Sequence, residues 1–116
     1  MKGYKVVKTT IKGKILSAIT ETGSIEYKKD QWVWPETDCG PLAVFRTFKE
    51  AEGFAGCGLG IWGCEYRPSK EKDLYYVYGY FNTSVRKMDH QCLPLGTILA
   101  AAVKITRCIS RGIYHI

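Results

Sequence analysis

The sequence predicts an α+β domain in which an antiparallel sheet of about six strands packs against one principal helix. Short segments rich in β-branched and aromatic residues recur along the 116 residues, separated by glycine, proline and polar turns. One segment, at about residues 48–56, instead has apolar residues at helical spacing. Apolar residues make up 46% of the chain and aromatic residues 13%, as in a folded globular core. At this length we expect residues 1–116 to form a single domain.

The clearest local signal is a strand that leads into a capped helix. Gly40-Pro41 precedes the apolar run Leu42–Phe45, which is typical of a buried strand. Thr47 and Glu50 then have the spacing of a capping box, in which the hydroxyl accepts from the N–H of residue 50. The apolar stripe of the helix comprises Phe48, Ala51, Phe54 and Ala55, and Gly56 ends it.

Further strands are predicted from alternation and composition. In chain order they are Tyr4–Thr10, Ile15–Ile19, Ile25–Tyr27, Ile61–Tyr66 and Leu74–Phe81. Within the third, Ile25 and Tyr27 share one face. Residues 97–109 are ambiguous, because their alanines favour a helix whereas their β-branched residues and the preceding Pro-x-Gly-Thr favour a strand. We favour the strand.

Two aromatic segments are candidates for exposed surface. The strand Leu74–Phe81 carries aromatic residues on both faces, so the face turned away from the core would suit a second protomer or a flat ligand. The segment Asn82–Leu93 that follows is polar and basic, and we expect an irregular, mobile functional loop there. Trp32 and Trp34 share a face of an extended chain, where a core or lid position is favoured over a ligand platform.

The charge is uneven along the chain. Its net value is +6, and residues 1–14 contribute five lysines without an acid. Residues 84–116 contribute five arginines and lysines against one aspartate. If the two ends meet in the sheet, one face becomes electropositive and suited to phosphate; the alternative is a solvated surface without a ligand.

Motifs for catalysis or for a metal are weak. The run Gly58-x-Gly60-x-x-Gly63 follows a helix and precedes a strand, the reverse of a dinucleotide-binding unit. The five cysteines include no Cys-x-x-Cys pair, so we expect buried free thiols, no metal and no cofactor. His90 with Cys64 or Cys92, or Glu65 as a base, are the remaining catalytic alternatives. We expect a protein that is not an enzyme.

The composition also bears on location. No stretch reaches the roughly 18–20 apolar residues of a membrane helix. The first residues, Met1 to Lys5, lack the apolar region of a signal peptide. We therefore expect a cytoplasmic protein with no membrane partner.

The chain is well supplied with groups that bind a nucleotide-like anion. Arg107 and Arg111 share a face whether their segment is a strand or a helix, and Arg86 and Lys28 are further candidate phosphate donors. Phe81 offers a ring on which a base could stack, and Asn82 beside it could contact a base edge. We expect a small anionic nucleotide as ligand, with nucleic acid as a further partner to consider.

A pattern spread over most of the chain resembles small proteins of phages and prophages. It consists of Tyr4-Lys5-Val6-Val7, Ser17-Ala18-Ile19, Glu26-Tyr27-Lys28, Trp32, Gly40-Pro41-Leu42-x-Val44-Phe45-x-Thr47, Glu50-Ala51, Phe54-Ala55, Ile61-x-x-Cys64-Glu65 and Leu93-Pro94-x-Gly96-Thr97. In size and layout the chain is similar to the phage anti-Thoeris sponges.

That resemblance implies a non-enzymatic homo-oligomer, a dimer or larger, acting in the host cytoplasm. The sponges sequester cyclic ADP-ribose-type signals, and some take cyclic oligonucleotides, thereby counteracting host anti-phage defence. Their sites use arginines near the C-terminus and an aromatic ring on adenine, to which Arg107, Arg111 and Phe81 correspond here in type and location. The alternatives are a basic nucleic-acid-binding module and an ADP-ribosyltransferase-like enzyme that consumes a nucleotide.

Overall fold

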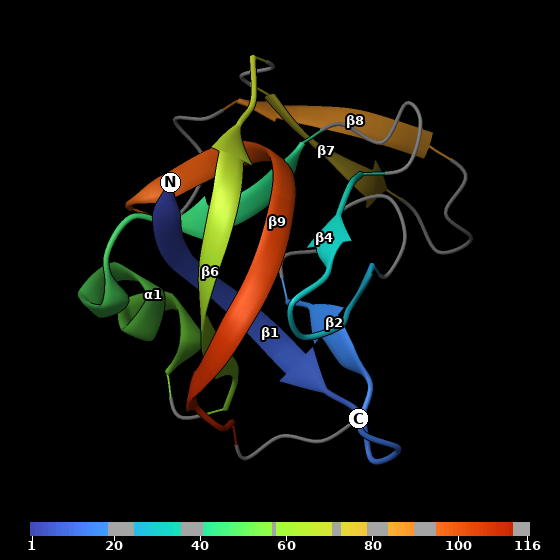
Figure 1. Ribbon diagram of the computed structural model, residues 1–116. Coiled ribbons are helices and arrows are strands. Elements are labelled where there is room, and N and C mark those ends of the chain that lie inside the picture. Colours follow the sequence, from blue (N-terminus) through green and yellow to red (C-terminus); the bar gives the residue numbers. More distant parts are fainter. Residues whose placement is uncertain are drawn as a thin grey trace.

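The computed structural model describes residues 1–18, 25–35, 41–56, 58–70, 73–78, 84–89 and 95–112 (Figure 1). Its elements in chain order are β1 (Lys2–Thr9), β2 (Ile15–Ser17), β3 (Glu26–Tyr27), β4 (Trp32–Val33), β5 (Leu42–Phe45), α1 (Phe48–Ala55), β6 (Gly60–Pro68), β7 (Asp73–Tyr78), β8 (Ser84–Asp89) and β9 (Thr97–Ser110). All strand pairings are antiparallel, in one seven-stranded sheet and a two-stranded sheet of β7 and β8. The expected α+β class, with an antiparallel sheet and one helix, is confirmed for the described part of the chain.

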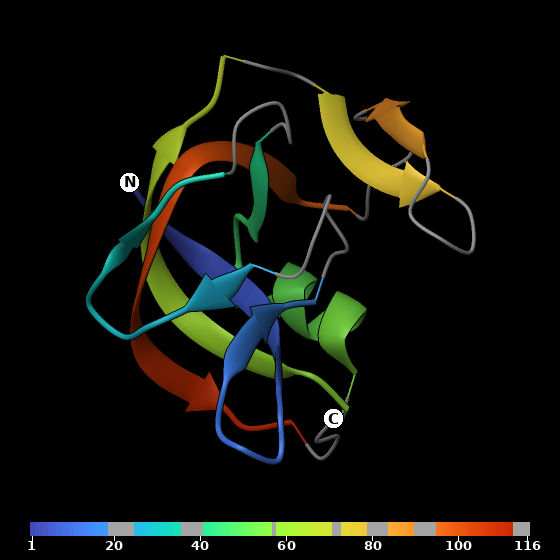
Figure 2. The same cartoon turned by 90° about the vertical axis from the view of Figure 1, so that its right-hand side faces the viewer.

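Strand β6 closes the larger sheet on itself. The strand order is β3-β2-β1-β5-β9-β4, and β6 pairs with both β1 and β9. The strands β1, β5, β9 and β6 therefore form a closed ring of neighbours, in which no strand is left with a bare edge along its whole length. Figures 1 and 2 show the long, bent strands β6 and β9 crossing over β1. The basic N-terminal strand and the basic C-terminal strand thus lie on either side of β6.

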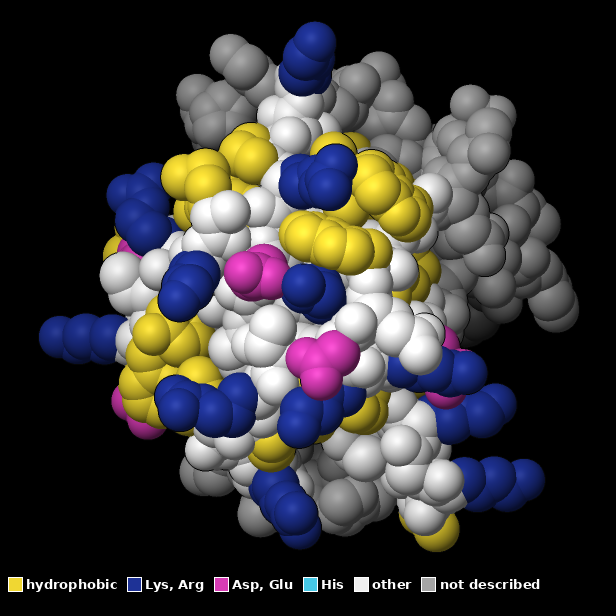
Figure 3. Space-filling view, in the orientation of Figure 1, with side chains coloured by type: hydrophobic (Ala, Val, Ile, Leu, Met, Phe, Trp, Pro, Cys, Tyr) yellow, Lys and Arg dark blue, Asp and Glu magenta, His cyan; other side chains and the backbone are white. Residues whose placement is uncertain are grey.

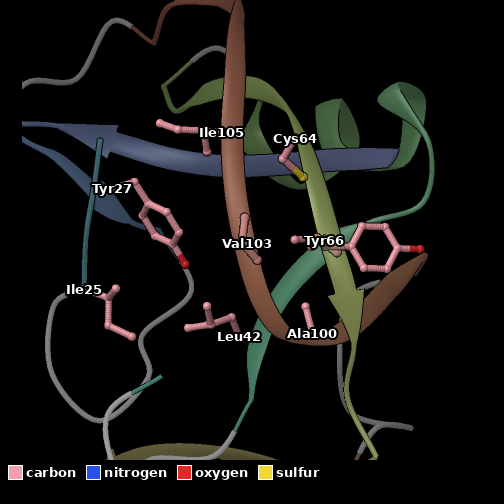
Figure 4. Packing of buried hydrophobic residues seen from close by; sticks show 9 residues of the cluster. Ile25, Tyr27, Leu42, Cys64, Tyr66, Ala100, Val103 and Ile105 are labelled. Atoms are coloured by element: carbon pink, nitrogen blue, oxygen red, sulfur yellow. The ribbon is translucent and has the colours of Figure 1, made fainter. Parts of the chain in front are cut away.

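The ring encloses the larger of two apolar clusters. Tyr27, Leu42 and Val103 are directed into the space between the strands (Figure 4), and all three are 1% exposed or less. Ile25 and Tyr27 are both buried in this cluster, which confirms the face predicted for them. Strand β5 is buried at every position because this cluster lies on one side and α1 on the other.

The helix packs its predicted stripe against the outside of the ring. Ala51 and Ala55 are buried with Phe45 and Val6, and Phe48 and Phe54 border them. At its start, the Glu50 N–H donates to Thr47 Oγ1 at 3.2 Å, as the capping box predicts. The Glu50 side chain also takes part, since Thr47 Oγ1 donates to its Oε1 at 3.0 Å.

A lysine lies in the interior of the ring. Lys5 is fully buried, and its Nζ donates to the carbonyl oxygen of Ala43 at 2.6 Å. The same Nζ lies 5.3 Å from the centroid of the Tyr27 ring. A hydrogen bond to a carbonyl and a cation–π contact offset part of the cost of removing the ammonium group from water.

Two sequence-based expectations for the C-terminal half have different outcomes. The ambiguous segment is the strand β9, as favoured, and it runs to Ser110. The expectation of an irregular loop over residues 82–93 is wrong for residues 84–89, which form β8 and pair with β7 from Asp73↔Asp89 to Tyr78↔Ser84. A polar segment can form a strand when it pairs with a neighbouring strand of high β-propensity. An antiparallel pair needs apolar side chains on one face only.

Candidate functional site

A row of side chains crosses the outer surface of four neighbouring strands. Lys2 on β1 is paired in register with Glu65 on β6, Glu65 with Lys104 on β9, and Lys104 with Trp32 on β4. Residues directly opposite one another in an antiparallel sheet are the closest side-chain neighbours. The row therefore brings two bases, an acid and an aromatic ring together from four separate segments of the chain.

The centre of the row is an ion pair. Lys104 Nζ lies 2.9 Å from Glu65 Oε2, with the two side chains 26% and 42% exposed. The hydrogen bond from Lys104, and next its charge, lower the pKa of the Glu65 carboxyl below its usual range. Glu65 is therefore held ionised and already bound, which makes it a poor proton acceptor at neutral pH.

Beside this row lies an open cleft of about 620 Å³. It is lined by Lys2, Gly3 and Tyr4 of β1, Arg46 after β5, Gly63, Cys64 and Glu65 of β6, and Thr106, Arg107 and Ile109 of β9. Two of the lining positions, Gly3 and Gly63, have no side chain. Gly3 has no space for one, because a Cβ there would lie 2.9 Å from the Phe45 carbonyl oxygen.

A β-bulge directs Arg107 into the cleft. Cys64 is paired with Ile105 and Gly63 with Arg107, so β9 has one extra residue, Thr106, at this point. Thr106 Oγ1 donates to the Gly63 carbonyl oxygen at 3.1 Å and holds the bulge. Regular alternation would place Arg107 on the same face as the buried Ile105, whereas the bulge places it on the face of the cleft.

The cleft is electropositive. Its cations, Lys2, Arg46 and Arg107, come from three separate elements, and all three side chains are exposed. Within the described residues, none of them is within ion-pair distance of a carboxylate, and the one acid in the lining is paired with Lys104. On the face of Figure 3 that β6 and β9 form, lysine and arginine side chains surround the acidic ones. Such a site favours an anion.

The thiol that lines the cleft is buried and has a raised pKa. Cys64 is 3% exposed, and its burial raises its pKa to about 11 against the opposing charge of Lys5 and a hydrogen bond from the Gly3 backbone. The thiolate is the nucleophilic form, so Cys64 is not poised for covalent catalysis at neutral pH. Among the described residues, no group of three or more histidine, cysteine or acidic side chains could hold a metal ion.

Of the six residues predicted as the site, the structure describes the side chains of three, and it does not bring these three together. Arg107 lines the cleft, but Arg111 lies beyond the end of β9 and lines a second, smaller cavity of about 220 Å³. The structure therefore does not bring these two arginines together in one cavity. A second irregularity lies between them, because Trp62 is paired with Cys108 and Ile61 with Ser110, which leaves Ile109 as an extra residue that changes the alternation. Lys28 is exposed in the turn after β3 and lines neither cavity.

Three of the predicted residues remain without a structural test. Arg86 is on β8, of which the backbone is described, and Phe81 and Asn82 lie outside the described residues.

Arg46 is the cleft residue that the sequence analysis missed. It interrupts an otherwise apolar strand–helix unit as the one base between Leu42 and Phe48, and this isolation was the available signal. Tyr4, also unpredicted as a site residue, is half-buried in the lining and packs edge-on against Phe48, with ring centroids 6.0 Å apart.

No helix in the described part of the chain is long and apolar enough to cross a membrane. No family model, no curated protein and no solved structure matches this chain.

Proposed function

We propose that this protein is a non-enzymatic binding protein that sequesters a small phosphate-bearing nucleotide in the cleft between β1, β6 and β9. The observation that carries the proposal is the convergence of Lys2, Arg46 and Arg107 on one cavity, where no carboxylate of the described residues is paired with them. Arginine suits phosphate because its planar fork donates two parallel hydrogen bonds to two oxygens. A volume of about 620 Å³ lies in the usual range for a small-molecule site.

The same cleft is poorly equipped for catalysis. A nucleotide-consuming enzyme needs a base or a nucleophile close to the ligand. The two reactive groups in the lining are Cys64, whose raised pKa keeps the thiol protonated, and Glu65, whose lowered pKa accompanies its bond to Lys104. Both features support binding without turnover.

The resemblance to phage sponges suggests the kind of nucleotide and its role. We propose a cyclic ADP-ribose-like or cyclic oligonucleotide signal of host anti-phage defence, bound by a homo-oligomer. In this proposal Arg107 and Arg46 hold phosphate, and Tyr4 provides the aromatic ring in the cleft.

The test is calorimetric titration with cyclic ADP-ribose isomers and cyclic di- and trinucleotides, followed by heat denaturation and mass analysis of the released ligand. Binding at micromolar concentration or tighter, with the ligand recovered intact, supports sequestration. Conversion of the ligand would instead indicate an enzyme, and absence of binding across the panel would refute the proposal. Light scattering with size-exclusion chromatography tests the oligomer separately.

A further inference from the structure

A second group of aromatic and basic side chains lies on the far side of the Lys104–Glu65 pair. The guanidinium carbon of Arg67 is 5.0 Å from the centroid of the Trp32 ring and 5.6 Å from that of Trp34. Lys104 Nζ lies 5.2 Å from the Trp32 centroid. Within the described residues, the side chain of Arg67 has no hydrogen bond and no ion pair. We call Trp32, Trp34 and Arg67 the tryptophan strip.

The sheet register explains how these side chains meet. Arg67 on β6 is paired with Ala102 on β9, and Trp34 follows the β4 pairs Trp32↔Lys104 and Val33↔Val103, which brings it to the same level. The side chain of Ala102 is small and its residue fully buried, so the longer side chains from β6 and β4 can meet above it. The arrangement is set by backbone pairing on both sides and is therefore preorganised.

The tryptophan strip lies at the surface, whereas the sequence favoured a core or lid position over a ligand platform. Trp32 is half-buried, Arg67 is exposed, and Trp34 is 55% exposed. Trp32 has cations within 5.2 Å and serves to hold them in place. Trp34 contacts Arg67 and has more than half of its surface in water, so it can accept a further planar group.

A tryptophan ring beside an arginine fork has the chemistry that binds single-stranded nucleotides. Every base has a flat face that stacks on an aromatic ring, and the adjacent guanidinium attracts the phosphate that follows it. Lys104 adds a second cation at the strip, although Glu65 shares it. The strip and the cleft are continuous, since Lys104 and Glu65 form the border of both.

We propose that the tryptophan strip is a nucleobase-stacking subsite, so that the ligand is an oligonucleotide of at least two nucleotide units. Arg107 and the level of Trp34 are four residues apart along β6, from Gly63 to Arg67, which is roughly 13 Å at about 3.3 Å per residue. That separation exceeds the reach from phosphate to base in one nucleoside monophosphate. A ligand with one phosphate in the cleft and a base on Trp34 therefore spans more than one unit. This inference rests on the proposed function for its phosphate site, but the strip itself does not.

The test is to titrate the intact protein with AMP and with the linear dinucleotide pApA, monitoring calorimetry and tryptophan fluorescence. The variants are Trp34→Ala, Trp34→Phe and Arg107→Ala, with Lys12→Ala as a control for loss of an exposed cation. Lys12 is in the exposed turn between β1 and β2, at the opposite end of the molecule from the end of β6 that carries Arg67 (Figures 1 and 2).

We expect pApA to bind more tightly than AMP. Trp34→Ala should weaken pApA about five- to hundredfold while leaving AMP unchanged, and Trp34→Phe should retain most of the affinity. Equal affinities for AMP and pApA, or a Trp34→Ala variant that binds pApA like the wild type, would overturn the subsite.

The same variants distinguish an error in the phosphate site from an error in the stacking subsite. If Arg107→Ala leaves both affinities unchanged while Trp34→Ala weakens pApA, the phosphate site is wrong and the stacking subsite stands. If Arg107→Ala weakens both probes while Trp34→Ala weakens neither, the cleft stands and the subsite is wrong. Absence of binding by either probe overturns both.

Discussion

Lys104 Nζ lies 2.9 Å from Glu65 Oε2, and this pair forms the border between the electropositive cleft and the tryptophan strip. Glu65 is the one acid among the described lining residues of the cleft, so it opposes the field of Lys2, Arg46 and Arg107. Its ion pair with Lys104 also partly neutralises the positive charge of Lys104, which would otherwise attract an anion. We therefore expect the pair to limit the affinity of the cleft for an anion.

Replacing Glu65 should strengthen anion binding. In Glu65→Gln the negative charge is gone and Lys104 is released, so we expect AMP to bind about two- to fivefold more tightly, the usual size of an exposed pairwise charge effect. Calorimetry at two salt concentrations measures this, and the gain should shrink at the higher salt. Glu52→Gln, on the exposed face of α1, is the control. Equal or weaker binding by Glu65→Gln would contradict the assigned role.

Burial of Cys64 should make stability depend on pH in the alkaline range. Its pKa is raised from 9.0 to about 11 in the folded protein, so the stabilisation is complete below pH 9 and is lost as the pH rises toward 11. At pH 10.5 the wild type should have lost about 2 kcal/mol more of its unfolding free energy than Cys64→Ala has, relative to pH 8. Urea denaturation at the two pH values measures the difference.

The control for this experiment is Cys108→Ala, which removes an exposed thiol and should keep the wild-type pH dependence. Parallel pH profiles for the wild type and Cys64→Ala would show that the thiol titrates alike in both states.

Lys5 should contribute to stability mainly through its buried aliphatic chain and its hydrogen bond to the Ala43 carbonyl oxygen. Lys5→Ala leaves a cavity inside the ring and an unpaired carbonyl lone pair, so we expect a loss of about 2–5 kcal/mol in unfolding free energy. Lys5→Met keeps most of the volume and avoids burying a charge, so its loss should be smaller. Denaturant titration compares both with Lys12→Ala. A Lys5→Ala variant as stable as the wild type would contradict this contribution of the Lys5 side chain.

The capping hydroxyl of Thr47 should be worth about 1 kcal/mol. Thr47→Ala leaves the Glu50 N–H without its acceptor at 3.2 Å, and the expected loss follows from the general cost of removing an N-cap. Thr47→Ser preserves the hydroxyl and should restore nearly all the stability. Thermal unfolding distinguishes the two variants. Equal melting temperatures for Thr47→Ala and Thr47→Ser would mean that the cap does not hold the helix.

The local elements could be predicted from the sequence because their causes are local. The cap at Thr47, the buried pair Ile25 and Tyr27, and the strand character of residues 97–110 all follow from side chains within a few positions of one another. The polar segment 84–89 was misjudged because its strand depends on pairing with β7, a partner that its own composition does not reveal.

The closure of the sheet and the shape of the site depend on distant residues. Nothing in the local pattern of β6 shows that it pairs with both β1 and β9, about 60 positions before and 40 after it. Arg107 was identified by its charge, but its place in the cleft depends on the bulge at Thr106, and Arg46 joins it through the tertiary fold. Regular alternation placed Arg107 and Arg111 on one face, whereas a second irregularity, at Ile109 between them, separates them into two cavities.

The most direct test of the cleft compares three arginine variants for binding of a phosphate-bearing nucleotide. Arg46→Ala and Arg107→Ala remove cleft cations, whereas Arg111→Ala removes a base from the other cavity and serves as the matched control. Calorimetric titration with AMP should show affinity falling about tenfold for each of the first two, as expected for a charge-assisted hydrogen bond of roughly 1.5–3 kcal/mol. Arg111→Ala should bind like the wild type. If Arg111→Ala loses affinity while Arg46→Ala and Arg107→Ala keep it, the phosphate site is not in this cleft.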